Sequence, residues 1–74
     1  MITIIARNPI GNRYRIKVLD DGSRVREITI TGTAPSWMQK RIQTYSITKP
    51  YIMNAIALLR AELIQHGELE TIIT

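Results

Sequence analysis

The chain has 74 residues, no cysteine and a formal net charge of +4, from ten Lys and Arg against six Asp and Glu. This length fits a single small domain, residues 1–74, and excludes a multidomain enzyme. Without cysteine there is no disulfide and no thiolate metal site, and with His66 as the one histidine there is no histidine-rich metal centre. The core of such a short chain is marginal, so a second subunit is the stabilising device that remains.

The first 32 residues have the pattern of a three-stranded antiparallel meander. Residues rich in β-branched side chains predict strands at 2–6, 13–18 and 24–31. Between them, residues 8–12 contain Pro and Gly, and residues 20–23 read Asp-Asp-Gly-Ser, a strong hairpin signal. The two aspartates are therefore expected to form the turn rather than a catalytic carboxylate pair.

Apolar and basic residues alternate along the second strand, which predicts one buried and one solvated face. The apolar residues are Tyr14, Ile16 and Val18, and the basic ones are Arg13, Arg15 and Lys17. Thr29 and Thr31 of the third strand are expected to flank the basic column. The outer face of the meander is thus predicted to be basic and hydrogen-bonding, with no large apolar group.

The hairpin register stays open between two alternatives, both of which keep Ile28 and Ile30 on the apolar face. A five-residue loop pairs Ile16 with Ile28 and Lys17 with Glu27, whereas a three-residue loop pairs Arg15 with Glu27. Either alternative leaves Arg26 in the apolar column, with its stem on the core and its head in water.

From residue 33 onward the pattern becomes helical. We expect a short helix over residues 36–45 with Thr33 as its N-cap, and a break at residues 46–48. Thr48 or Lys49 then caps a longer helix with Pro50 in its first turn, and this helix runs to about His66 and stops at Gly67. The helical part thus spans residues 33–67, and residues 68–74 form a tail.

The second helix is apolar nearly all round, which requires cover on more than one side. Its expected core stripe is Ile52, Ile56, Leu59 and Leu63. The apolar residues outside that stripe are Met53, Ala57, Leu58, Ala61 and Ile64. We therefore expect a homodimer through residues 50–66. The alternative cover is the tail from Leu69 to Thr74, folded over the helix as an extra strand.

The positive charge favours a polyanionic partner, DNA or RNA. No acid occurs between Ile28 and Ala61, while the C-terminal tip is acidic, and seven of the ten basic residues are arginine. The candidate nucleic-acid-binding residues are Arg13, Arg15, Lys17, Arg24, Arg26, Lys40, Arg41 and Lys49. The alternative is an ordinary solubilising charge. Trp37, beside Lys40 and Arg41, is an equal candidate for base stacking and for packing.

No motif for catalysis, a metal, a cofactor or a small-molecule substrate is present, so a non-enzymatic protein is expected. His66, at the end of the second helix, is expected to be structural. The longest apolar run, Ala55 to Leu59, is too short for a membrane span, and the N-terminus lacks a signal-peptide pattern. A cytoplasmic location is the expectation.

Residues 26–63 resemble a ribbon-helix-helix DNA-binding unit, with a strand, a short helix, a Ser/Thr turn and a longer helix. The similarity is carried by the run from Ser46 to Ile56, although Pro50 replaces a small polar residue and the usual glycine is missing. In that family two strands pair across a dimer and enter the major groove. The resemblance implies that Thr29 and Thr31 face bases and that Thr48 and Lys49 contact the backbone.

Three basic strands with a turn at Asp20–Gly22, followed by a helix, are also similar to the arm-type DNA-binding domains of phage integrases. That resemblance implies that the sheet lies on the duplex, with Arg13, Arg15 and Lys17 in contact. The sequence thus predicts an α+β domain that binds DNA as a regulatory homodimer. The competing hypothesis is a protein-interaction subunit that docks through the second helix.

Overall fold

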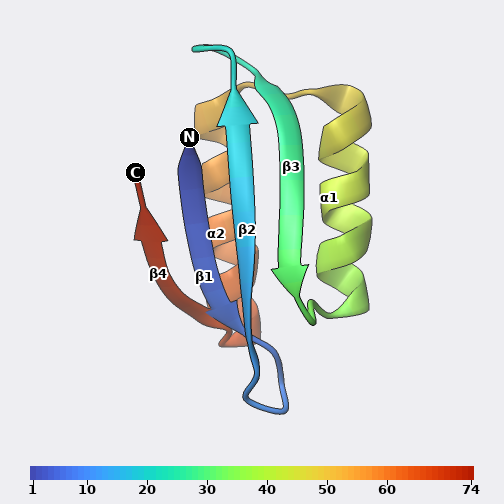
Figure 1. Ribbon diagram of the computed structural model, residues 1–74, viewed down its shortest axis with the longest axis vertical. Coiled ribbons are helices and arrows are strands. Elements are labelled where there is room, and N and C mark those ends of the chain that lie inside the picture. Colours follow the sequence, from blue (N-terminus) through green and yellow to red (C-terminus); the bar gives the residue numbers. More distant parts are fainter.

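The computed structural model describes all of residues 1–74, as a four-stranded antiparallel sheet with two helices on one face (Figure 1). The elements are β1 (Ile2–Arg7), β2 (Arg13–Asp20), β3 (Val25–Gly32), α1 (Ser36–Thr48), α2 (Ile52–His66) and β4 (Leu69–Ile73). The strand order is β3-β2-β1-β4, so β3 and β4 are the edges. The predicted α+β class, the meander, the two helices and the C-terminal strand are confirmed.

The faces of the hairpin agree with the prediction, but both predicted registers are wrong. Ile16 lies opposite Ile30 and Lys17 opposite Thr29, a shift of two residues from the five-residue-loop alternative, and Arg15 lies opposite Thr31. The shift keeps the parity, so Ile28 is buried and Ile30 packs on the core from its edge. The cross-strand pairs expected for Glu27 are therefore absent, and Glu27 lies opposite Leu19.

A β-bulge changes which residue of β3 enters the core. The register shifts between Leu19 and Asp20, so that Asp20 pairs with Val25. Val25 is 1% exposed, while Arg26 lies in solvent rather than in the apolar column. Burying valine and leaving arginine in water is the favourable exchange, because an unpaired buried charge is costly.

The first helix is longer than predicted, because residues 46–48 continue it instead of breaking it. The hydroxyls of Thr44 and Thr48 donate to carbonyls one turn back, so these residues are accommodated in the helix. The helix ends where Lys49 adopts φ 48°, since Pro50 disfavours a helical residue before it. Pro35, not Thr33, occupies the N-cap position.

The second helix begins at Ile52 with Tyr51 in the N-cap position, so neither Thr48 nor Lys49 caps it and Pro50 precedes its first turn. Its predicted end at Gly67 is confirmed. Gly67 has φ 69° and donates to the carbonyl of Ile64, while Glu68 donates to that of Leu63, a Schellman arrangement. This turn reverses the chain into β4.

The tail extends the sheet and leaves the outer side of α2 uncovered. The predicted extra strand forms, but β4 pairs with β1 at the edge of the sheet and does not cover the outer side of α2. Met53, Leu58 and Ile64 remain 74%, 53% and 54% exposed. The buried residues of α2 are Ile52, Ala55, Leu59 and Leu63. Ile56, expected in this stripe, is partly buried and packs against the core.

A buried hydrogen bond joins the middle of the sheet to the start of β4. The Tyr14 hydroxyl donates to Glu68 Oε1 at 2.8 Å, and both side chains are at most 5% exposed. Burial, together with the hydrogen bond and charge of Glu68, raises the pKa of Tyr14 well above its ordinary value. The hydroxyl therefore stays protonated as the donor that Glu68 requires.

We expect Tyr14→Phe to lower the free energy of unfolding by about 1–3 kcal/mol, because Glu68 then lacks its buried donor. Urea unfolding measures the change. The double variant Tyr14→Phe/Glu68→Leu should recover most of it, since both polar partners are then replaced by apolar groups. Tyr51→Phe, at an exposed tyrosine, is the control and should have little effect. Equal stability of Tyr14→Phe and the wild type would contradict this account.

Candidate nucleic-acid interface

Neither helix covers the second face of the sheet, which we call the open face (Figure 1). Side chains alternate across a sheet, and paired residues share a face. The register therefore places on the open face Thr3, Ile5, Arg7, Arg13, Arg15, Lys17, Leu19, Glu27, Thr29, Thr31, Thr71 and Ile73. The basic column of β2 thus lies between two other strands rather than at an edge.

Arg15 and Lys17 form the unpaired part of this column. Arg15 lies between Ile5 of β1 and Thr31 of β3, and Lys17 lies between Thr3 and Thr29. Both side chains are exposed, and neither belongs to any of the four ion pairs in the structure. Two free cations flanked by hydroxyls can meet an anion without first breaking an ion pair.

Arg13 is exposed in the same column, but Glu70 pairs with it. Arg13 Nη2 lies 2.7 Å from Glu70 Oε1 and Arg13 Nε lies 3.1 Å from Oε2, a bidentate contact. Arg7 Nε, at 3.4 Å from Oε2, completes the cluster. Although desolvation opposes the shift, Arg13 and then Arg7 hold the pKa of Glu70 below its ordinary value. Glu70 thus neutralises one end of the basic column.

Arg7 was missing from the predicted site, because nothing in its local sequence places it beside Arg13. The antiparallel register of β1 and β2 makes them directly opposite each other. The signal available in the sequence was the parity of β1, which puts Arg7 on the face of Thr3 and Ile5. Placing Arg7 beside Arg13 also requires the register in which β1 and β2 pair across the loop between them.

A hollow of about 240 Å³ lies on the open face between the arginines of β2. Its lining residues are Ile5, Arg13, Tyr14, Arg15, Thr31 and Gly32. Gly32 has φ 95°, and a Cβ there would lie 2.9 Å from the Arg13 carbonyl oxygen, so only glycine fits. The half-buried Ile5 and Leu19 and the exposed Ile73 correct the expectation of a face without large apolar groups.

Arg24 and Lys49 lie at one end of the sheet, where the hairpin meets the junction between the helices. The Arg24 guanidinium lies 4.5 Å from the centre of the Tyr51 ring, and its Nη1 donates to the Lys49 carbonyl at 3.4 Å. The adjoining turn is held by Asp21, whose carboxylate accepts from the backbone of Arg24 and Ser23, which lowers its pKa. The turn-forming role predicted for the aspartates is confirmed.

The other predicted cations do not join the open face. Lys40 and Arg41 project from α1 in the helical layer, and Arg41 Nε forms an ion pair with Glu62 Oε1 of α2 at 2.8 Å. Arg26 is exposed on the bulged part of β3. The eight predicted residues therefore fall into four groups, of which the β2 column is the one that lies on the open face.

The aromatic candidate for base stacking is engaged within the chain. Trp37 stacks on His66, with ring centres 4.2 Å apart and planes 12° apart. This contact joins the start of α1 to the end of α2, so the packing alternative for Trp37 and the structural role for His66 are the ones that the structure favours. Tyr45 is buried in the core, as predicted.

No three or more His, Asp or Glu side chains are placed to hold a metal ion together. Neither helix has the length and hydropathy needed to cross a lipid bilayer. The sequence matches no protein-family model, and neither a curated protein nor a solved structure shows significant similarity to the chain.

We expect Glu70→Gln to lower stability at neutral pH and to have no effect in acid. A carboxylate with a lowered folded-state pKa stabilises the fold above its unfolded pKa of about 4.3, and this contribution is lost as pH falls through the folded value. Urea midpoints of the wild type and the variant should thus converge between about pH 5 and pH 2. Glu27→Gln, at an exposed unpaired carboxylate, is the control. A constant difference across this range would contradict the ion-pair account.

Proposed function

We propose that this protein is a non-enzymatic, cytoplasmic nucleic-acid-binding protein, that its target is DNA, and that its open face makes the contact. The observation that carries the proposal is the position of Arg15 and Lys17. These neighbouring cations form no ion pair and lie at the centre of a sheet face that neither helix covers. Their positive charge attracts phosphates, and each phosphate neutralised releases counterions from the polyanion.

The residues around the two cations suit a nucleic-acid backbone. Thr29 and Thr31 are directly opposite Lys17 and Arg15, so each cation has a hydroxyl donor beside it. The resemblance to ribbon-helix-helix units implicates these threonines, and the resemblance to integrase arm domains implicates the β2 cations. Since both sets lie on one face, the two resemblances support the same surface. The strand pairing between subunits of the ribbon-helix-helix family is not part of this proposal.

We further propose that two copies associate through the outer side of α2, as a regulatory homodimer. Met53, Ala57, Ala61 and Ile64 recur at helical spacing and are all exposed. Two alanines at the centre with a large residue at each end can contact the same stripe of a second, antiparallel copy. The competing hypothesis is that this stripe docks a different protein, which a monomeric chain would favour.

Replacing the two free cations should weaken DNA binding. We expect Arg15→Gln/Lys17→Gln to lower affinity for a duplex at low salt by at least about tenfold and to reduce the salt slope by about 2, near 0.9 for each lost phosphate contact. Fluorescence anisotropy over a salt series measures both. Lys40→Gln/Arg60→Gln removes the same charge from the helical layer and is the matched control.

Equal losses in the two double variants would show that net charge, not the open face, determines binding. Wild-type affinity that is flat in salt would exclude the phosphate mechanism. Single-stranded RNA and DNA of the same length belong in the same series, since a preference for RNA would overturn the assignment of DNA as the target.

The dimer has its own test. We expect Ala61→Arg to convert a dimer into a monomer, because it places a charge at the centre of the proposed contact without changing a buried residue. Light scattering gives the solution mass of each protein. Gln43→Arg, on the exposed side of α1, is the control and should keep the wild-type mass. A monomeric wild type at high concentration would reject the homodimer.

A further inference from the structure

The outer edge of β3 is free along most of its length. β3 pairs with β2 on one side alone, and the Val25 amide donates across its outer side to the Pro50 carbonyl at 2.8 Å. From Arg26 to Gly32 no strand lies on this side, which leaves seven residues, or roughly 23 Å, of edge. Such an edge presents unpaired backbone donors and acceptors.

The middle of this edge carries none of the usual devices against strand addition. Ile28-Thr29-Ile30-Thr31 is a run of β-branched residues without charge or proline, and the bulge lies at the first end of the strand. Ile30 is half-buried, so part of its apolar side chain stays available to a neighbour. The edge therefore keeps the properties of a strand that accepts another.

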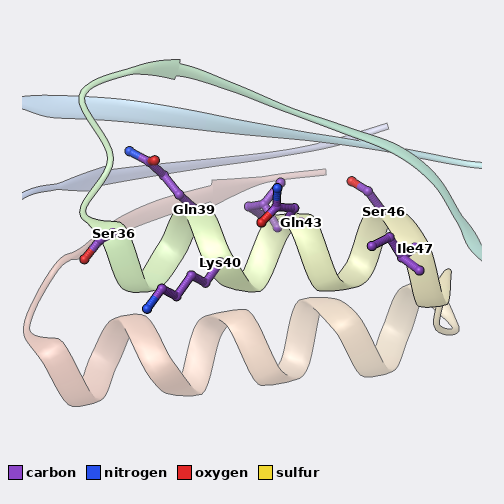
Figure 2. Close-up of a pocket in the computed structure, with 7 residues that line it drawn as sticks. Ser36, Gln39, Lys40, Gln43, Ser46 and Ile47 are labelled. Carbon is purple, nitrogen blue, oxygen red and sulfur yellow. The ribbon is translucent and has the colours of Figure 1, made fainter.

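α1 extends beneath the place that an added strand would occupy. Figure 1 shows α1 beside β3, beyond the edge of the sheet, and the two elements are in contact. A groove of about 450 Å³ runs along this helix and is lined by Ser36, Gln39, Lys40, Ile42, Gln43, Ser46 and Ile47. In Figure 2, Gln39 and Ser46 project from α1 toward the side of the sheet. A strand added to β3 would have this groove as its floor.

The charges around the groove select an acidic occupant. Lys40 lines the groove, Arg26 stands at the first end of the free edge, and no acid occurs from Ile28 to Ala61. The carboxylate of Glu27 belongs to the open face, because Glu27 lies opposite Leu19 in the register, and α1 lies on the other face of the sheet. Electrostatic complementarity therefore favours a negatively charged segment over a neutral or basic one.

The occupant must also be an isolated strand. If β3 of a second copy paired with this edge about a two-fold axis, two α1 helices would compete for the space beneath the same two strands. An extended segment without a helix of its own avoids this conflict. We propose that the free edge of β3, with the α1 groove beneath it, binds an acidic peptide segment of a partner protein by β-strand addition.

The probe for this site is an eight-residue peptide of alternating glutamate and threonine, titrated into the full-length protein and followed by NMR. We expect amide shifts confined to residues 26–32 and 36–47, and slower hydrogen exchange at edge amides of β3, because added backbone hydrogen bonds protect them. The matched peptide with lysine in place of glutamate should bind about tenfold more weakly. A form of the acidic peptide with methyl groups on alternate backbone nitrogens should not bind. One edge of this peptide lacks the N–H groups that would donate to the carbonyls of β3.

Three variants of the protein separate this site from the open face. Gln43→Trp fills the groove from an exposed position and should abolish binding, and Lys40→Gln should weaken it severalfold. Arg15→Gln/Lys17→Gln should bind the acidic peptide as the wild type does. Circular dichroism verifies that each variant is folded.

Several results would overturn the proposal. These are the absence of shifts at millimolar peptide, shifts confined to β4 or to α2, equal binding of the lysine or methylated peptide, and loss of binding in Arg15→Gln/Lys17→Gln. The last result would assign the peptide to the basic open face instead. Failure of DNA binding leaves this test unaffected, because it uses a different surface and a different ligand.

Discussion

The alternation of side chains along β2 is the constraint on which the structure depends. β2 lies between β3 and β1 in the sheet. Its apolar side chains, Tyr14, Ile16 and Val18, are buried in the core between the sheet and the helices. The same alternation forces Arg13, Arg15 and Lys17 to the opposite face. If a third layer covered that face, the arginines and the lysine would be buried without partners at a high cost. The two-layer architecture and the basic surface therefore have one cause.

Which cations of the β2 column are free of ion pairs depends on contacts with residues that are distant in the sequence. Glu70, which β4 brings beside β1, pairs with Arg13 and Arg7 and leaves Arg15 and Lys17 as the free cations. The position of β4 follows from the turn at Gly67 and from the buried bond between Tyr14 and Glu68. One short segment thus closes the sheet, supplies a buried acceptor and restricts the positive potential to the centre of the face.

The two helices divide the remaining surface. α1 lies partly beyond β3 and lines a groove at the sheet edge, while α2 covers the middle of the sheet and presents Met53 and Ile64 to solvent. The Trp37–His66 stack and the Arg41–Glu62 pair join the helices on their facing sides. The open face, the β3 edge and the outer side of α2 are consequently three separate surfaces of one small domain.

Local pattern by itself determined the strands, their faces, the two helices and the stop at Gly67, because side-chain periodicity and glycine's left-handed conformation act over a few residues. It also determined that Arg15 and Lys17 share a solvated face. Only the tertiary structure decided the hairpin register, since the bulge that exchanges Arg26 for Val25 is set by which residue the core buries. It likewise decided the path of the tail and the neutralisation of Arg13 by Glu70, 57 residues away. Distant pairing of this kind depends on how whole elements pack, and no short window of sequence contains that information.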